Sequence, residues 1–185
     1  MIRRTLTLTI TAALTTTLTA CTSGSATPTP FTPSPAPSST QASPDESVQA
    51  AEQAVAAYKR YIQVIDAMTS SGGVAVKDLP LVTTGIELKA SQNQADTYRG
   101  RRIRTIGSTE VVWVRAKQPS PSQGSAITAV AVEACYDTSK LKAVDAAGKD
   151  IRQPGTPTRW LDSRDVQLVA GSWKVSNGRN RGAKC

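Results

Sequence analysis

The chain has 185 residues, with 22 lysines and arginines against 14 aspartates and glutamates, which gives a net charge of +8. It contains no histidine, so the side chain that most often transfers protons near neutral pH is absent. Aromatic residues make up 4% of the chain and form no base-stacking motif, so the positive charge does not indicate nucleic-acid binding. Length and composition suit one domain of common size.

The N-terminus has the parts of a bacterial export signal. Two arginines are followed by an uncharged stretch at residues 5–20. This stretch is shorter than the roughly 20 apolar residues that a membrane-spanning helix needs. It closes on Leu18-Thr-Ala-Cys21, which resembles a lipobox. We expect a lipoprotein signal peptide at residues 1–20 and a diacylglyceryl anchor on Cys21, which places the protein on the outer face of the cell membrane. The alternative is an ordinary signal peptide followed by full secretion.

A tether is expected at residues 21–44. This segment is almost wholly Ser, Thr, Pro, Ala and Gly, a composition with too little apolar surface to pack and enough proline to favour extended backbone. Such a disordered tether would hold the folded part roughly 30 to 70 Å from the anchor. The domain itself is expected at residues 45–185.

Two helical segments open the domain. Apolar residues recur every three or four positions over residues 45–69, which predicts an amphipathic helix that ends at Ser70-Ser-Gly-Gly73. A second helix is expected at about residues 79–99, with a break in its first half because Pro80 and Gly85 both disfavour a continuous helix.

Extended segments make up the rest of the domain. The sequence predicts strands over the ranges 103–114, with a bulge or bend at Gly107, 127–136, 141–144, 159–169 and 172–175. Helices followed by antiparallel strands indicate an α+β fold in which the N-terminal helices pack on a curved antiparallel sheet.

Several short motifs carry a family resemblance over about residues 48–185. They are the helix running into Tyr98-Arg-Gly100, Ala134-Cys-Tyr-Asp137, Val144-Asp145 before Gly148, Gly171-Ser-Trp-Lys-Val175 and the terminal Cys185. Together they are similar to small exported actinobacterial lipoproteins with an NTF2-like (cystatin-like) cone fold. The resemblance implies a cone-shaped hollow between the helices and the sheet. It transfers no function, because this superfamily includes enzymes, binding modules and scaffolds.

The three cysteines fit this scheme. Lipidation of Cys21 leaves Cys135 and Cys185, which would form a disulfide in an oxidising compartment. The resembling lipoproteins pair a cysteine of the middle strand with one near the C-terminus in the same way. A metal site on these thiols is disfavoured, because no histidine is available to complete it, and no cofactor is expected.

Aromatic side chains are the candidates for lining the hollow. They are Tyr58, Tyr61, Trp113, Tyr136 and Trp160. Asp66 with a tyrosine is the one arrangement that resembles an isomerase-type site, but no catalytic residue is assigned. A buried Asp paired with a Tyr in the pocket would favour catalysis.

The function expected from the sequence is a non-enzymatic binding module for an envelope protein or a small apolar ligand. Two other hypotheses are a phage- or prophage-encoded superinfection-exclusion lipoprotein and an isomerase-like enzyme. Basic clusters around Arg99–Arg104 and in the C-terminal tail are expected to be solvated surface, with weak affinity for anionic surfaces as the second interpretation.

Overall fold

The computed structural model describes residues 44–117, 119 and 126–185. The signal peptide, Cys21 and the tether that the sequence predicts lie outside these residues, apart from Pro44. The elements in chain order are α1 Pro44–Ser70, α2 Leu79–Val82, α3 Gly85–Arg101, β1 Arg104–Ile106, β2 Glu110–Ala116, β3 Ala129–Asp137, β4 Lys142–Val144, β5 Arg159–Val169 and β6 Ser172–Gly182.

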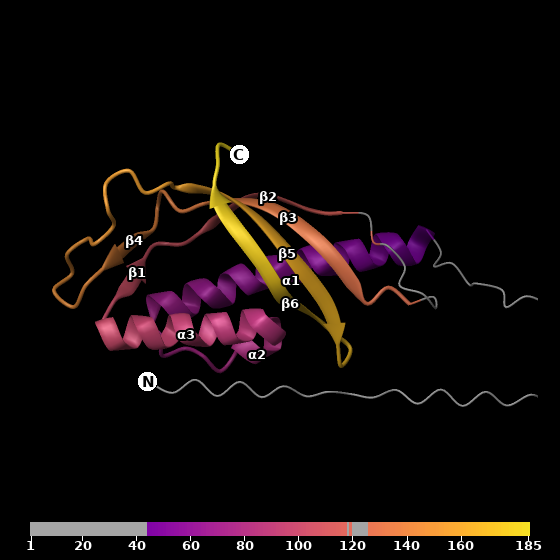
Figure 1. Cartoon of the computed structure of the whole chain (residues 1–185), viewed down its shortest axis with the longest axis horizontal. Helices are drawn as coiled ribbons and strands as arrows, with labels where there is room; N and C mark the ends of the chain where they lie inside the picture. Colours follow the sequence, from indigo (N-terminus) through magenta and orange to yellow (C-terminus); the bar gives the residue numbers. More distant parts are fainter. Residues whose placement is uncertain (1–43, 118, 120–125) are drawn as a thin grey trace, which may run out of the picture. The chain divides into compact units, whose positions relative to one another are not determined.

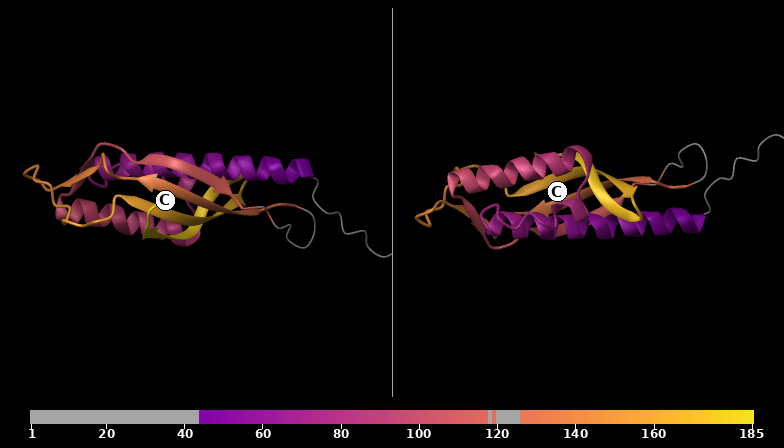
Figure 2. Two further views of the ribbon diagram at one scale, coloured as in Figure 1. Left: turned by 90° about the horizontal axis from the view of Figure 1, so that it is seen from above. Right: turned by 90° about the horizontal axis from the view of Figure 1, so that it is seen from below.

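A four-stranded antiparallel sheet in the order β2-β3-β5-β6 forms one layer, and the helices form the other. The strands arch over α1 and α3, which lie side by side on one face of the sheet (Figures 1 and 2). The short strands β1 and β4 pair separately. The α+β class, with N-terminal helices packed on a curved antiparallel sheet, is therefore confirmed.

The hydrophobic core lies between α1 and the sheet. Ala54 and Tyr58 of α1 are fully buried, and they meet the inward-facing side chains of β3, β5 and β6. On β3 these are the alternate residues Val130, Val132 and Ala134, as expected for a strand with one buried face. This core and the Cys135–Cys185 disulfide both lie within the compact unit Ser38–Cys185. We therefore expect this unit to fold on its own.

The predicted break in the second helix is confirmed. Residues 79–82 form α2, and α3 starts at Gly85, whose φ of +55° lies in the left-handed region. The expected single strand over 103–114 is wrong, because β1 and β2 belong to different sheets. Gly107 separates them with a φ of +96°, and a Cβ there would lie 2.1 Å from the carbonyl oxygen of Lys140. Its role is to end a strand rather than to bend one.

The last strand is much longer than the sequence indicated. The apolar pattern ends at Val175, yet β6 continues to Gly182 by pairing with β5. Its second half is polar, and the register shifts where Asp165 pairs with Asn177 and Val166 with Val175, so that Ser176 is the extra residue of a β-bulge. The bulge decides which residues of this polar half face the helices.

Candidate functional site

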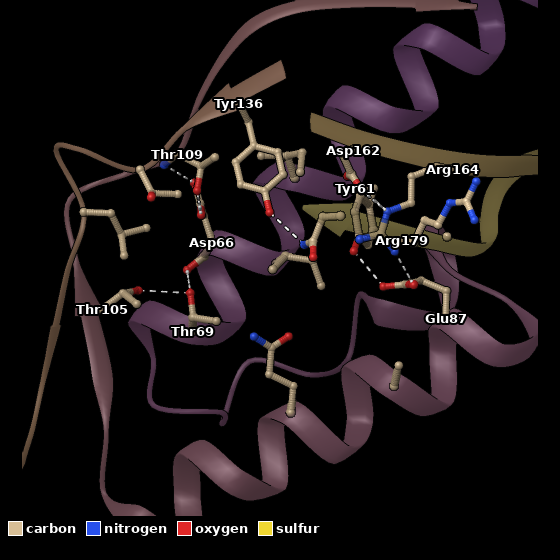
Figure 3. A pocket seen from close by; sticks show the side chains of 18 of the residues that line it. Tyr61, Asp66, Thr69, Glu87, Thr105, Thr109, Tyr136, Asp162, Arg164 and Arg179 are labelled. Atoms are coloured by element: carbon tan, nitrogen blue, oxygen red, sulfur yellow. Dashed lines mark hydrogen bonds and ion pairs between the residues drawn. The ribbon is translucent and has the colours of Figure 1, made fainter. Parts of the chain in front are cut away.

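A polar cavity of about 370 Å³ lies between the helices and the sheet. Its walls come from α1, α3, β1, β3, β5, β6 and the segments that precede β2 and follow β3. Figure 3 shows Asp66 and Thr109 on one side, Glu87 and Arg164 on the other, and the ring of Tyr136 between them. The cavity thus stands where the resemblance placed a hollow, but its walls carry several charged groups.

Arg164 of β5 ties together two carboxylates from different elements. Its Nε donates to both oxygens of Asp162, at 2.8 and 3.0 Å, and its Nη1 donates to Oε2 of Glu87 on α3, at 2.5 Å. Two tyrosines of α1 complete the network. The hydroxyl of Tyr58 donates to Asp162 at 3.0 Å, and that of Tyr61 donates to Glu87 at 2.6 Å. The network therefore links α1, α3 and β5 through buried, charge-assisted hydrogen bonds.

Burial is the largest single influence on the pKa of Asp162, Tyr58, Tyr61 and Arg164. Asp162 is fully buried, and the loss of solvent raises its pKa although Arg164 and Tyr58 act in the opposite direction. Burial also raises the pKa of Tyr58 and of Tyr61, so both hydroxyls stay protonated and can donate. Burial lowers the pKa of Arg164, but Tyr61, Asp162 and Glu87 outweigh it and raise the pKa overall, so the guanidinium stays charged.

Gly178 of β6 makes room for Arg164. The two residues are direct partners across β5 and β6, and a Cβ at position 178 would lie 2.2 Å from Cδ and 2.9 Å from Nε of Arg164. No real side chain tolerates contacts this short without a shift. The glycine is therefore a requirement of the network.

The far side of the cavity has its own carboxylate. Asp66 of α1 accepts hydrogen bonds from the backbone N–H and the hydroxyl of Thr109, at 2.8 and 2.7 Å. The hydroxyl of Tyr136 accepts a hydrogen bond from the amide of Asn180 at 2.9 Å, and burial raises the pKa of Tyr136 to about 12. Each of the three carboxylates in the wall is thus already engaged within the protein.

Two of the five aromatic residues singled out in the sequence line the cavity. Tyr61 and Tyr136 line the cavity, whereas Tyr58 packs in the core behind it and reaches Asp162. Trp160 is partly buried, pairs with Tyr136 across β3 and β5, and is not among the lining residues.

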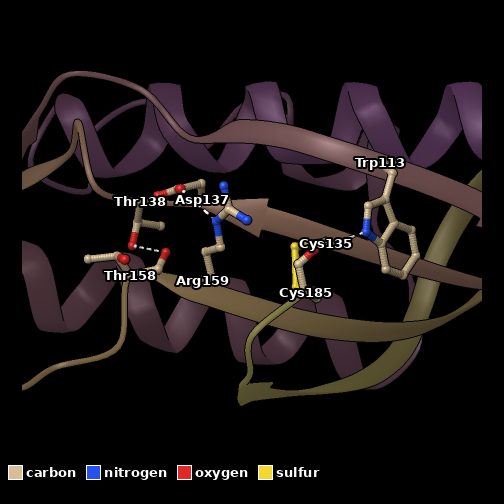
Figure 4. Close-up of a disulfide and its surroundings, with 7 residues drawn as sticks. All are labelled: Trp113, Cys135, Asp137, Thr138, Thr158, Arg159 and Cys185. Carbon is tan, nitrogen blue, oxygen red and sulfur yellow. Dashed lines mark hydrogen bonds and ion pairs between the residues drawn. A yellow bond between two sulfur atoms is a disulfide. The ribbon is translucent and has the colours of Figure 1, made fainter.

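Trp113 lies on the other face of the sheet. A bulge in β2 lets Val111 pair with Tyr136 but Trp113 with Cys135, so the indole turns away from the helices. Figure 4 shows it beside the C-terminus, where its Nε1 donates to the carbonyl oxygen of Cys185 at 3.4 Å.

The predicted Cys135–Cys185 disulfide is present, with 5.9 Å between the two Cα atoms. It fastens the end of the chain across the outer face of β3 (Figure 4). Within the described ranges, no three His, Cys, Asp or Glu side chains gather in a group that could hold a metal ion.

Sequence reasoning missed Glu87, Asp162 and Arg164. One signal was present in the pattern: Trp160, Asp162, Arg164 and Val166 alternate along β5, so two charged residues share the face of a residue that is fully buried. Ionisable groups on a core-facing strand position are uncommon unless they are paired, and they mark a candidate site.

No family model and no curated protein matches this sequence. Solved structures match its fold. The intermembrane-space region of chloroplast protein ARC6 is 16% identical, with a TM-score of 0.53, and the match covers 72% of this chain and 97% of that one.

Two other neighbours are Aln2 from a Streptomyces species (14% identity, TM-score 0.42, 77% and 93% covered) and a calcium/calmodulin-dependent protein kinase II association domain from Xanthomonas campestris (9%, 0.41, 68% and 85%). These neighbours have NTF2-like α+β folds. At such identities the likeness shows the fold alone.

Proposed function

We propose that this protein is a membrane-anchored, extracytoplasmic lipoprotein that binds a small polar molecule, without chemistry, in the cavity between its helices and its sheet. The observation that carries the proposal is the lining of that cavity. Its walls present Asp66, Glu87 and Asp162, several hydroxyl groups and the amide of Asn180. Sites of this size hold small ligands by a few fixed polar groups, and these groups fit a polar ligand better than the apolar one expected from the sequence.

The charge of the wall favours a ligand with a positive group. Three carboxylates border the cavity against one guanidinium group, that of Arg164. Arg179 also borders the cavity, but its register on β6 turns its side chain to the other face of the sheet. The rings of Tyr98 and Tyr136 border it as well, and aromatic faces attract cations, as the guanidinium of Arg164 over the Tyr61 ring illustrates, at 5.3 Å from its centre. A small organic cation would gain from both features.

An isomerase-like activity is the second candidate, because Tyr58 and Asp162 form a buried Tyr–Asp pair. Binding is favoured over catalysis because each carboxylate that could serve as a base is already a hydrogen-bond acceptor. Asp162 is held by Arg164 through both oxygens, and Asp66 by Thr109 in the same way. An envelope protein as partner and a superinfection-exclusion role are further hypotheses, for which the cavity offers no specific support.

A panel of small ligands tests the binding proposal. Organic cations, uncharged molecules of the same shape and the corresponding anions are titrated by calorimetry. Ala90→Trp narrows the cavity from α3 without removing a charged group, and Gln92→Trp places the same bulk on an exposed position of that helix. We expect binding that Ala90→Trp weakens at least about ten-fold and that Gln92→Trp leaves unchanged. Equal affinity in both variants would place the ligand elsewhere, and turnover of any bound compound would favour the enzyme.

The anchor is tested separately. The Cys135–Cys185 disulfide supports an oxidising location, because such bridges persist mainly outside the cytosol. Among the described residues no helix combines the length and apolar character that crossing a bilayer requires. We expect Cys21→Ser to release the protein into the medium or to leave it unprocessed. If that variant still partitions into the detergent phase like the wild type, the lipid is not on Cys21.

A further inference from the structure

The face of the sheet opposite the helices carries a row of charged residues that the strand register places side by side. Arg115 pairs with Glu133, Glu133 with Ser163, and Ser163 with Arg179, so one line crosses all four strands. The next outward-facing line of paired residues, through Cys135 and Leu161, ends in Arg181 of β6. On the other side Lys117 donates its backbone N–H to the carbonyl oxygen of Ala131 at 2.8 Å. We call Arg115, Lys117, Arg179 and Arg181 the basic outer face.

Positive charge on this face exceeds the negative charge. Arg115 is satisfied locally: it binds Glu133 at 2.7 Å and its guanidinium lies 4.8 Å from the centre of the Trp113 ring. The hydrogen bond from Arg115 lowers the pKa of Glu133, and Lys117 and Arg181 lower it further, so all three bases act on one carboxylate.

The other bases have no such partner. In the part of the chain that the structure describes, the side chains of Lys117, Arg179 and Arg181 make no direct ion pair, and all three residues are exposed. Asp165 is the other carboxylate beside these four bases, so four bases stand there against two acids. Asp137 and Glu110 lie further along the same face, in ion pairs with Arg159 and Lys140.

Two adjoining clefts give anionic groups a place between these side chains. Their volumes are about 380 and 390 Å³, and Lys117, Ser163 and Arg179 border both of them. The Ser163 hydroxyl lies between the bases and adds a hydrogen-bond donor. Bases around a shallow polar cleft fit the oxygens of a phosphate group.

We propose that the basic outer face binds the anionic phospholipid headgroups of the membrane to which the chain is tethered. The proposal rests on the proposed anchor, because a tether keeps the domain within reach of that surface and makes a weak contact effective. Stable membrane attachment commonly combines one lipid signal with a basic patch. Neighbouring β2 adds Trp113 and the exposed Val112, and tryptophan favours the boundary between headgroups and water. Binding in this orientation leaves α1 and α3 facing away from the membrane.

The test uses the unit Ser38–Cys185, which has its own core and disulfide, with vesicles of phosphatidylcholine alone or mixed with phosphatidylglycerol. Co-sedimentation measures the partition coefficient. The variant is Lys117→Gln with Arg181→Gln, and Arg179 is left unchanged because it also borders the cavity. The matched control, Lys59→Gln with Arg60→Gln, removes the same charge from exposed positions of α1.

We expect the unit to bind the anionic vesicles and not the neutral ones. The outer-face variant should bind about twenty-five-fold more weakly, at roughly five-fold for each charge, and the control should change binding less than about two-fold. Equal losses in the two variants, or no preference for anionic vesicles, would overturn the proposal. Resonance shifts of the outer-face residues with inorganic phosphate, but no vesicle binding, would also overturn it and assign a soluble phosphate ligand. The Cys21→Ser experiment is independent, so a missing anchor and a missing headgroup site give different results.

Discussion

Replacing Arg164 with methionine tests whether the buried network holds the helices on the sheet. Methionine keeps most of the volume of the side chain but removes its charge and its donors. Asp162, which is fully buried, loses the bonds from Nε to both of its oxygens, and Glu87 loses the bond from Nη1. Two carboxylates then face each other in the protein interior without a cation between them.

The expected loss of unfolding free energy follows from this geometry. Breaking a buried pair by removing one partner costs about 3–5 kcal/mol, because the remaining charge stays desolvated. For a domain of this size that lowers the melting temperature by about 10–20 °C. The matched control is Arg159→Met on the same strand. Its ion pair with Asp137 is exposed, with side-chain exposures of 50% and 16%, so its loss should cost less than about 1 kcal/mol.

The dependence on pH gives a second readout. The folded pKa of Asp162 is raised, so between its ordinary value and the raised one the folded state binds more protons than the unfolded state. Stability therefore falls as the pH rises through this window. Arg164 acts to lower the pKa of Asp162, so its removal moves this pH window upward. The loss of unfolding free energy caused by Arg164→Met should therefore be smaller at pH 5 than at pH 7.5.

Urea unfolding followed by tryptophan fluorescence at both pH values measures these differences. A loss no larger than that of Arg159→Met would show that the network adds little to stability. If the loss of unfolding free energy in Arg164→Met grows as the pH falls, the assignment of charge to the two carboxylates is refuted.

Two further predictions concern the frame around the cavity. Cys135→Ala with Cys185→Ala opens a loop with a sequence separation of 50 residues, so we expect a loss of about 4 kcal/mol in urea unfolding, and unchanged stability would contradict the chain-entropy argument. Gly178→Ala should destabilise the protein by about 1–3 kcal/mol and shift the resonances of Arg164, because its Cβ needs the space of that side chain. Gly100→Ala in α3 is the matched control. Nothing lies within 4 Å of a Cβ there, so it should stabilise the protein by up to about 1 kcal/mol, and equal effects at the two glycines would disprove the steric argument.

The elements with one buried apolar face were predictable from the sequence. The stripe along α1 and the alternation of Val130, Val132 and Ala134 reflect burial against a core, and burial is what hydrophobic periodicity records. The break before α3 was predictable for a different, local reason, because the backbone conformation at Gly85 favours glycine.

The cavity was harder to foresee, because its residues come from separate elements and are polar. Glu87 lies on α3, whose surface shows little apolar periodicity, and it becomes buried only when Arg164 meets it across the fold. The polar half of β6 shows no strand pattern either, since its extension depends on the partner strand β5. The burial of Glu87 and the length of β6 therefore both depend on tertiary contacts rather than on local sequence preference.

The bulge at Ser176 connects the two faces of the sheet. Strict alternation after the buried Val175 would turn Arg179 and Arg181 toward the helices, next to Arg164. The extra residue, whose hydroxyl donates to the carbonyl oxygen of Asp165 at 3.1 Å, reverses the alternation. Gly178 and Asn180 then face Arg164 and Asp162, and the arginines join the outer row. This one inserted residue turns the arginine side chains away from the cavity and concentrates positive charge on the opposite face of the sheet. The polar-ligand site and the headgroup site that we propose therefore depend on the same β-bulge.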